Sequence, residues 1–499
     1  MNRRRSTNAL TTIRIFFWAF FIFVAWVSAA PARQEKAGES DQKLVLRAPT
    51  PNRVYQRDQA GFGEIKLDLV NKEKYKNIQV LVMGGEGFDT VIEEAEFGDG
   101  VLRGIPTGGP YLINIRADED SVEVDPIYVG DVWILAGQSN MEGVADLIDV
   151  TPPNPKVMLL GMDGKWDEAK EPLHWLVDSP DPVHSGDPAN RAERSKRMHA
   201  NRRKGAGLGL PFGVAMTEAL GVPIGLVACA HGGTSMEQWS PAKKGEEGKS
   251  LYGSMLRQFE LAGGKARGVL WYQGESDANP NAAPKYAKVM EEFIAAVRSD
   301  FHDPDLPFYL VQIGRVVRGG DPKDWNMVQD AERLIPEKIA HTAVASVIDL
   351  ELDDGIHVGT HGHKRLGKRL ANLALRNLFG HVGATTPTFE SVSRGARNRL
   401  IVKFRDVNFS QEDTRLRGLQ PTRHIAGFSL RKADGSEIPL IFDASVGPAP
   451  DTVVLKLNGR LPEGAFLWYG WGFDPYCNLV DAWDAAVPVF GPIALDPVK

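Results

Sequence analysis

A serine, an aspartate and a histidine lie in segments that could together perform acyl transfer. Ser139 lies in Gly137-Gln138-Ser139-Asn140-Met141, and Asp354 stands three residues before His357. A serine hydroxyl is a weak nucleophile until a base takes its proton, and histidine titrates in the right range to be that base. A carboxylate on the second imidazole nitrogen would hold the correct tautomer. We therefore expect Ser139 as nucleophile, His357 as general base and Asp354 as the orienting carboxylate.

Two further segments carry groups that could stabilise a developing oxyanion. They are His231-Gly232-Gly233-Thr234-Ser235 and Gln273-Gly274-Glu275-Ser276-Asp277. Backbone N–H groups of Ser139 and of Gly232 or Gly233, with the side-chain amide of Gln273, are the candidate donors. The residues do not decide between Gly232 and Gly233, and Glu275 could share the orienting role of Asp354. The further candidate orienting or substrate contacts are Gln138, Asn140 and Trp239.

Each of these residues has a simpler interpretation when it is taken alone. A serine after a strand is commonly a helix cap, and Gly-Gly or Asp-Gly pairs are commonly turns. Tryptophan is a large core residue, so packing is the favoured interpretation of Trp239, Trp271 and Trp325, although each could stack on a sugar ring. The chemical interpretation gains its weight from the joint placement of the four segments.

The elements that would position these segments are apolar runs alternating with helical patterns. The expected strands are Val132–Ala136, Ile224–Ala230, Gly268–Tyr272, Phe308–Ile313 and Thr342–Leu350, and the expected helices are Pro211–Gly221, Leu251–Leu261, Ala283–Asp300, Val328–Ile339 and Gly362–Leu378. Most of these runs lack polar alternation, which is typical of parallel strands covered on both faces. Ligands bind at the carboxyl ends of such strands, where the four segments lie. We predict an α/β doubly wound parallel sheet over residues 131–380.

The flanking regions show a different pattern, in which short strands are separated by Gly and Pro. Before the α/β region the expected strands are Glu64–Val70, Ile78–Met83, and Tyr111–Arg116 paired with Val122–Ile127; after it they are Leu400–Arg405, Gly427–Arg431, Glu437–Phe442, Thr452–Leu457 and Ala465–Trp471. Asp434-Gly435 is expected to be a hairpin turn. This spacing predicts β-sandwich-like domains over residues 44–128 and 386–495.

The four segments, together with Trp239 and Trp271-Tyr272, resemble the sialate O-acetylesterase domain family. That family belongs to the SGNH-hydrolase superfamily and is related to the acetylxylan esterases of carbohydrate esterase family 6. The resemblance covers about residues 131–378, and it implies an SGNH-like, flavodoxin-like fold. A Gly-x-Ser-x-Gly elbow is not present, because Met141 stands at the second glycine position, which argues against the α/β-hydrolase fold.

By this resemblance the chain is expected to be a serine esterase that removes O-acetyl groups from sialic acid or an acetylated polysaccharide. The resemblance implies Ser139, His357 and Asp354 as the catalytic residues, Gln273 and a glycine of the second segment in the oxyanion hole, and no metal or organic cofactor. The alternative hypothesis is a catalytically inactive glycan-binding or envelope-associated protein. The sugar, the position of the acetyl group and the oligomeric state are left open.

The amino terminus has the pattern of an export signal. Arg3, Arg4, Arg5 and Arg14 precede the apolar run Ile15–Val27, and small residues follow at 28–32. An apolar run of this length suits a signal peptide better than a spanning helix, which needs about 20 residues. We expect residues 1–32 to be a signal peptide and the protein to be periplasmic or extracellular. The alternative is a membrane anchor over residues 15–30.

Composition and charge exclude several classes of protein. The chain has 499 residues, of which 43% are hydrophobic and 24% charged, so it is not disordered. A formal net charge of −6 gives no global basic field, and no nucleic-acid partner is expected. The chain has one strongly basic run, which is interpreted as a solvated surface loop and consists of Arg191, Arg194, Lys196, Arg197, Arg202, Arg203 and Lys204. The alternative is contact with an acidic or sulfated sugar near the rim of the active site.

Two other patterns are weak. His357, His361 and His363 could share a metal ion, but zinc would compete with the role of His357 as a base, so no metal site is predicted. Gly362 to Lys368 has the glycine and lysine spacing of a phosphate loop, but Arg369 stands where a hydroxyl is needed. The sequence does not show whether Cys229 and Cys477 meet.

Overall fold

The computed structural model describes residues 44–84, 92–93, 100–381, 383–409, 417–418 and 424–495. The signal peptide expected over residues 1–32 lies outside this part of the chain. Within it, no helix combines the length and the apolar character needed to cross a membrane. Cys229 and Cys477 are both buried and are not joined in a disulfide.

A mostly parallel sheet forms the centre of the described chain. Its parallel strands are β9 (Asp120–Gly137), β11 (Val157–Leu160), β14 (Ile224–Ala228), β15 (Gly268–Tyr272), β16 (Phe308–Val311) and β17 (Thr342–Ala345). The order β14-β9-β15-β16-β17 is that of a flavodoxin-like sheet, 2-1-3-4-5 in chain order. The prediction of an α/β fold with a parallel sheet is therefore confirmed. Strand β11 and the antiparallel edge strand β12 (Trp166–Glu168) extend the sheet beyond β14 and were not predicted.

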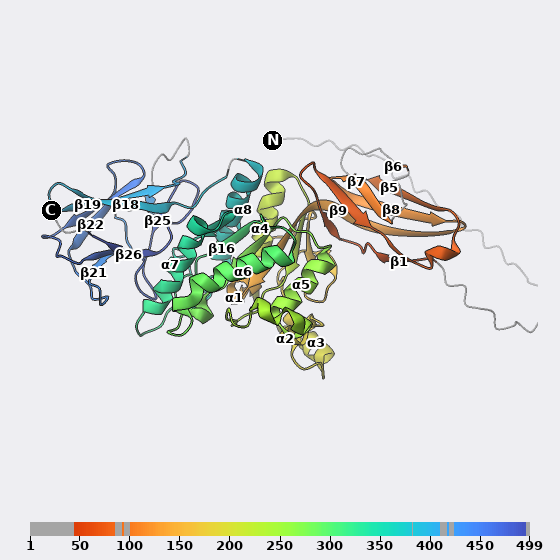
Figure 1. Cartoon of the computed structure of the whole chain (residues 1–499), viewed down its shortest axis with the longest axis horizontal. Helices are drawn as coiled ribbons and strands as arrows, with labels where there is room; N and C mark the ends of the chain where they lie inside the picture. Colours follow the sequence, from red (N-terminus) through yellow and green to blue (C-terminus); the bar gives the residue numbers. More distant parts are fainter. Residues whose placement is uncertain are drawn as a thin grey trace, which may run out of the picture. The chain divides into compact units, whose positions relative to one another are not determined.

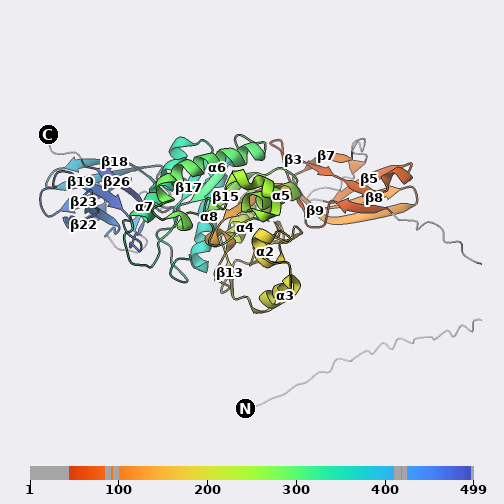
Figure 2. The same cartoon turned by 60° about the horizontal axis from the view of Figure 1, so that its bottom comes forward.

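Helices cover both faces of this sheet. They are α4 (Gly209–Leu220), α5 (Leu251–Ala262), α6 (Tyr286–Asp300), α7 (Lys323–Lys338) and α8 (Thr360–Phe379). Trp133 pairs with Gly268, an odd number of residues before Trp271, so the two indoles point to opposite faces. The Trp133 ring contacts Phe212 of α4, and the Trp271 ring contacts Phe293 of α6. Figures 1 and 2 show α8 beside α4, and α5 beside α6. This coverage explains why the strands are continuously apolar.

Strand β9 joins the N-terminal β-rich region to the central sheet. Its first half pairs antiparallel with β8 (Gly108–Ala117), as expected, and its second half pairs parallel with β14 and β15. The boundary expected between residues 128 and 131 therefore falls inside one continuous strand, drawn in orange in Figure 1. The other strands here are β1 (Val45–Ala48), β2 (Val54–Gln56), β3 (Phe62–Lys66), β4 (Asp68–Val70), β5 (Ile78–Gly84), β6 (Ile92–Glu93) and β7 (Val101–Pro106).

The C-terminal β-rich region has its own buried core, which includes Val402, Leu455 and Leu467. One sheet contains β18 (Thr388–Gly395), β19 (Arg399–Arg405), β22 (Ile441–Val446) and β23 (Thr452–Leu457), and a second contains β21 (Phe428–Arg431), β24 (Phe466–Tyr469) and β26 (Phe490–Ala494). Strands β20 (Arg417–Gly418) and β25 (Leu479–Val480) pair separately. Strand β22 begins later than the expected Glu437, beyond Pro439, which cannot donate to a strand ladder.

Short elements connect these layers near the carboxyl ends of the central strands. They are α1 (Ser139–Glu142), α2 (Pro182–Ser185), α3 (Arg191–Asn201), β10 (Ala145–Asp146) and β13 (Lys204–Ala206). Helix α3 has no buried residue, but only Lys196, Arg197 and Arg203 of the basic run are exposed and its other four side chains are half-buried. The solvated loop expected there is therefore a helix that is only partly solvated.

Candidate active site

Ser139 lies at the point where the strand order of the sheet reverses. Strand β9 ends at Gly137 between β14 and β15, and Ser139 begins α1. Gln138 N–H donates to the Tyr272 carbonyl at 2.8 Å. Gly137 has φ +137°, and a Cβ there would lie 2.2 Å from the Tyr272 oxygen, so only glycine allows this turn. The turn places Ser139 at the carboxyl end of a central strand, with 9% of its surface exposed.

Ser139, His357 and Asp354 form one chain of contacts. Ser139 Oγ lies 3.0 Å from His357 Nε2, and His357 Nδ1 lies 2.8 Å from Asp354 Oδ2. Asp354 Oδ1 also accepts from the backbone N–H groups of Ile356 and His357, at 3.0 and 2.9 Å. Partial burial raises the pKa of Asp354, but these donors outweigh burial and hold the pKa well below its usual range. The carboxylate is therefore ionised and aligned with the imidazole.

The loop that carries Asp354 and His357 is held from both sides. Asp353 Oδ2 accepts from Asp146 N–H at 2.7 Å, and Asp353 N–H donates to the His357 carbonyl at 2.9 Å. On the other side, Val317 N–H donates to the Gly355 carbonyl at 2.7 Å. These contacts fix the loop relative to the strand ends.

Asn140 links this loop to Glu275. Its Nδ2 donates to Glu275 Oε1 at 2.8 Å, and its Oδ1 accepts from Val358 N–H at 3.0 Å. Burial raises the pKa of Glu275, whose Oε2 is enclosed and has no partner among the described residues. Glu275 therefore contacts Asn140, while Asp354 occupies His357 Nδ1. Asn140 thus lies between Glu275 and the loop of His357, and its orienting role stays a prediction.

The structure separates the candidate oxyanion donors into engaged and unengaged groups. Gly232 N–H donates to Glu142 Oε2 at 2.9 Å. Gln273 is fully buried, and its amide donates to the Thr234 carbonyl at 3.0 Å and to Asp277 Oδ2 at 2.6 Å. The expectation that Gly232 and Gln273 donate to an oxyanion does not fit these contacts. The Gly232 N–H and the Gln273 amide already donate to other protein groups. Among the described residues, no hydrogen bond engages the N–H group of Ser139 or of Gly233. Gln138 is also buried, and its Oε1 accepts from Ser276 N–H at 3.3 Å.

Glu142 is a residue of the site that sequence reasoning missed. Burial raises its pKa, against the opposing effects of Gly232 N–H and Arg202. Arg202 Nη2 lies 3.5 Å from Glu142 Oε1, and Lys204 Nζ lies 3.5 Å from Asp354 Oδ2. Arg202 and Lys204, at the end of the basic run, therefore border the site. Their partners there are carboxylates of the protein itself. The available signal was spacing, since Glu142 stands three residues after Ser139 on a helical turn.

The tryptophans of the site segments are packing residues. Trp239 is 0% exposed, its Nε1 donates to Thr234 Oγ1 at 2.9 Å, and its ring packs on Trp271. Trp271 and Trp325 are also buried. The suggestion that Trp239 contacts substrate is wrong in this structure, because neither face of its ring is open to a ligand.

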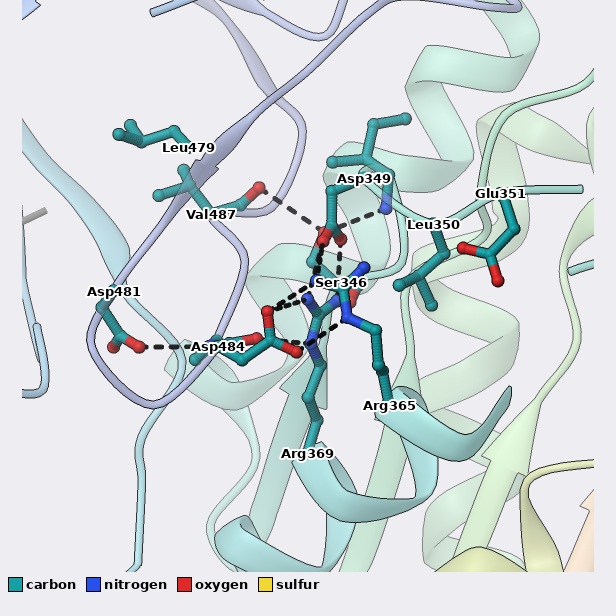
Figure 3. Close-up of polar contacts among 12 residues, drawn as sticks. Ser346, Asp349, Leu350, Glu351, Arg365, Arg369, Leu479, Asp481, Asp484 and Val487 are labelled. Atoms are coloured by element: carbon teal, nitrogen blue, oxygen red, sulfur yellow. Dashed lines mark hydrogen bonds and ion pairs between the residues drawn. The ribbon is translucent and has the colours of Figure 1, made fainter. Parts of the chain in front are cut away.

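An ion cluster lies beside the loop and connects α8 to the C-terminal β-rich region. Figure 3 shows Arg365 and Arg369 pointing toward Asp349 and Asp484. Arg369 binds both oxygens of Asp349 at 2.7 Å, and Arg365 binds Asp484 at 2.6 Å. Arg369, which fills the hydroxyl position of the phosphate-loop pattern, is thus a structural cation. The described part of the chain contains no group of three or more His, Cys, Asp or Glu side chains arranged to hold a metal ion.

A serine, a histidine and an aspartate in this contact order are the arrangement of serine hydrolases, placed here at the switch point of a parallel sheet. Residues 129–376 match the family model described as "Carbohydrate esterase, sialic acid-specific acetylesterase". A probable carbohydrate esterase of Arabidopsis thaliana is 30% identical over 288 residues, which cover 53% of this chain and 98% of that protein. The chain therefore belongs to the sialic acid-specific acetylesterase family of carbohydrate esterases, and it is a carboxylic ester hydrolase.

Two further comparisons differ in how much of the chain they cover. The sialate O-acetylesterase of Homo sapiens is 25% identical over 296 residues, which cover 50% of this chain and 54% of that protein. The solved structure of a carbohydrate acetylesterase from Xanthomonas citri covers 89% of this chain and 99% of its own, with a TM-score of 0.62 and 23% identity. The second comparison shows that the fold likeness extends beyond the α/β region.

Proposed function

We propose that this chain removes O-acetyl groups from carbohydrate through a covalent acetyl-Ser139 intermediate. The observation that carries the proposal is the contact chain from Ser139 Oγ to His357 Nε2, 3.0 Å, and from His357 Nδ1 to Asp354 Oδ2, 2.8 Å. Family membership supports an acetylated carbohydrate as substrate, either sialic acid or an acetylated polysaccharide.

In the first half-reaction Ser139 Oγ attacks the acetyl carbonyl while His357 Nε2 takes the hydroxyl proton. The carbonyl oxygen gains negative charge, and Asp354 stabilises the imidazolium that forms. When the tetrahedral intermediate collapses, the bond between the acyl carbon and the sugar oxygen breaks. His357 gives its proton to that oxygen, so the sugar leaves as an alcohol and the acetyl group stays on Ser139.

In the second half-reaction water attacks the acetyl carbon and His357 takes its proton. Collapse breaks the bond to Ser139 Oγ, releases acetate and returns the proton to Ser139. We assign the oxyanion donors to the backbone N–H groups of Ser139 and Gly233. The commitments of Gly232 N–H to Glu142 and of the Gln273 amide to Thr234 and Asp277 support this choice.

The proposal includes the location of the protein and its flanking domains. We propose export by the signal peptide at residues 1–32, with the anchor over residues 15–30 as the alternative. The flanking regions at 44–128 and 386–495 are proposed as β-sandwich-like domains around the catalytic domain at 131–380.

The test compares acetate release by the mature chain and its Ser139→Ala variant, from an aryl acetate and from a panel of acetylated glycans. The exposed Ser299 on α6 supplies the matched control Ser299→Ala. We expect release by the parent and the control and none by Ser139→Ala, with an acetyl adduct on the Ser139 peptide in rapidly quenched parent samples. Equal activity of Ser139→Ala contradicts the proposal. Glycan binding by a folded parent that cleaves no ester would favour the alternative of an inactive glycan-binding protein.

A further inference from the structure

A cavity of about 510 Å³ lies between helix α7 and the C-terminal β-rich region. One wall is the start of α7 with the residues before it, and the opposite walls are the hairpin at residues 432–435 and the aromatic rings of β24 and the turn after it. Its volume falls in the range of small-molecule sites, roughly 300–1,000 Å³. The lining shares no residue with the Ser139 site, so the proposed reaction leaves this cavity unexplained.

The aromatic wall is held in place by its surroundings. The rings of Trp468 and Trp471 meet edge to face, with centroids 4.6 Å apart. The Arg431 guanidinium lies 4.7 Å from the Trp471 ring centroid, and its Nη1 donates to the Gly435 carbonyl at 2.9 Å. Gly491 packs so closely on Trp468 that a Cβ there would lie 2.5 Å from the ring. A ligand would therefore meet a preformed apolar surface, which lowers the entropy cost of binding.

Polar groups with unused hydrogen-bonding capacity line the same cavity. Arg333 and the Gly491 N–H both contact Asp330 through Oδ1, so Oδ2 has no partner among the described residues. No hydrogen bond engages the indole N–H of Trp468 or Trp471 within the described chain. Asp330, Trp468 and Trp471 all line the cavity, so its walls combine apolar rings with residues that keep one carboxylate oxygen and two indole N–H groups unengaged.

The charges around the cavity nearly balance. Carboxylates come from Asp321, Asp330 and Asp434, and ammonium groups come from Lys323 and Lys432. Asp434 is partly satisfied, because its Oδ1 accepts from Ser436 N–H at 2.9 Å and from Ser436 Oγ at 2.6 Å. A lining with one more negative than positive side chain does not favour a phosphate, a sulfate or an acidic sugar. A neutral ligand with many hydroxyl groups suits it better.

We propose that this cavity is a second carbohydrate-binding site, which holds a neutral pyranose residue of the polymer that the enzyme deacetylates. A pyranose ring has an apolar C–H face that packs on indole, and ring hydroxyls that donate to a carboxylate and accept from N–H groups. The proposal rests on the proposed function only for the identity of the polymer. Occupation of this site would raise the local concentration of ester near the protein and lower KM for polymers.

The first test separates polymer from small substrate. Trp471→Ala and the cavity-blocking variant Ala433→Trp are compared with the parent on an aryl acetate and on acetylated xylan and glucomannan. Ala433 is exposed at the hairpin, so its replacement removes no packed side chain. We expect both variants to raise KM for at least one polymer about tenfold, with kcat and aryl acetate hydrolysis unchanged. Tyr476→Ala, at a 66% exposed aromatic residue outside the cavity, is the control and should match the parent.

The second test measures binding without turnover. Ser139→Ala is titrated calorimetrically with deacetylated xylo- and manno-oligosaccharides, alone and combined with Ala433→Trp. Binding that is weakened about tenfold by Ala433→Trp supports the proposal. No binding, or equal binding by both proteins, overturns it, as does an unchanged polymer KM in a parent that is active on those polymers. If the parent cleaves no ester, the proposed function fails and the titration alone decides on the cavity.

Discussion

The backbone N–H of Gly232 donates to Glu142 Oε2 over 2.9 Å, beside the nucleophile. A Cβ on Gly232 would lie 3.0 Å from this oxygen and 3.4 Å from the Ser139 Cβ. The contact joins two segments that are 90 residues apart in the sequence. The Glu142 carboxylate therefore holds the Gly232-Gly233 turn against Ser139, and we regard it as a positioning residue.

Replacing Glu142 by Ala should lower kcat about 10- to 100-fold, the equivalent of losing a hydrogen bond to a charged group. The turn that carries the proposed Gly233 donor would lose its anchor, and Arg202 would lose its carboxylate. Glu142→Gln keeps an acceptor for Gly232 N–H and should retain most of the activity. Steady-state kinetics on an aryl acetate with both variants make the comparison. Equal losses in the two variants would show that charge, and not the hydrogen bond, is what matters.

Asp354 and Glu275 should differ sharply when each loses its charge. Asp354→Asn removes the ionised partner of His357 Nδ1, so we expect kcat to fall about 1,000-fold or more. Glu275→Gln can still accept from Asn140 through its amide oxygen, so we expect a loss below about tenfold. The measurement is kcat for both variants on one substrate, with circular dichroism to show that both fold. A larger loss in Glu275→Gln would assign the orienting role to Glu275.

The sequence was informative where function depends on local spacing. Asp354 and His357 share one loop, and Ser139 follows an apolar strand. Reasoning from the ends of the predicted strands therefore singled out the loop and the serine. It failed where a contact joins distant segments. The partner of Gly232 N–H could not be found from Gly-Gly spacing, and the burial of Gln273 depends on Thr234 and Asp277, whose positions only the packed sheet determines.

Continuity of the chain was also hard to predict. A boundary was predicted between Tyr128 and Asp131 because short strands separated by Gly and Pro give way there to apolar runs that alternate with helical patterns. The structure keeps one strand and changes only its partners, from antiparallel β8 to parallel β14 and β15. Asp131 is buried in this stretch and pairs with Arg57 and Arg267, and these two partners allow a carboxylate inside the continuous strand.

Stability should depend on pH through His363, which is 0% exposed on α8 and has no hydrogen-bond partner among the described residues. Burial, with a smaller effect of His357, lowers the pKa of His363 to about 3. As pH falls below the unfolded value of about 6.5, the unfolded chain takes up a proton that the folded chain does not. The stability that this residue contributes is complete above that pH and is lost progressively toward pH 3.

At pH 5 this effect should cost about 2 kcal/mol relative to neutral pH. His363→Leu lacks the titrating group, so its free energy of unfolding relative to the parent should improve by that amount between pH 7 and 5. Urea unfolding of both proteins at the two pH values makes the measurement. Glu171, whose pKa burial raises to about 8, changes stability in the opposite direction but cancels in this comparison. A difference that does not change with pH would contradict the assignment.

Removing one charge from the ion cluster at α8 should lower the free energy of unfolding more than removing an acidic and a basic partner together. Asp349 is 1% exposed and Arg369 4% exposed, so Arg369→Leu leaves a buried carboxylate with Arg365 as its remaining cation. We expect a loss of about 3–5 kcal/mol in the free energy of unfolding. Asp349→Leu combined with Arg369→Leu should recover part of that loss, because Arg365 keeps Asp484 as its partner.

Lys288→Ala, at the exposed Lys288–Glu292 pair, is the control for the loss of a cation and should leave the unfolding midpoint unchanged. Asp349 of this cluster lies shortly before the loop of Asp354 and His357 in the chain, so kcat should fall in Arg369→Leu while the protein is still folded. Urea unfolding and aryl acetate hydrolysis on the same samples separate the two effects. A double variant less stable than Arg369→Leu would mean that Asp349 is stabilised by groups other than this arginine, such as the Arg365 guanidinium at 2.8 Å.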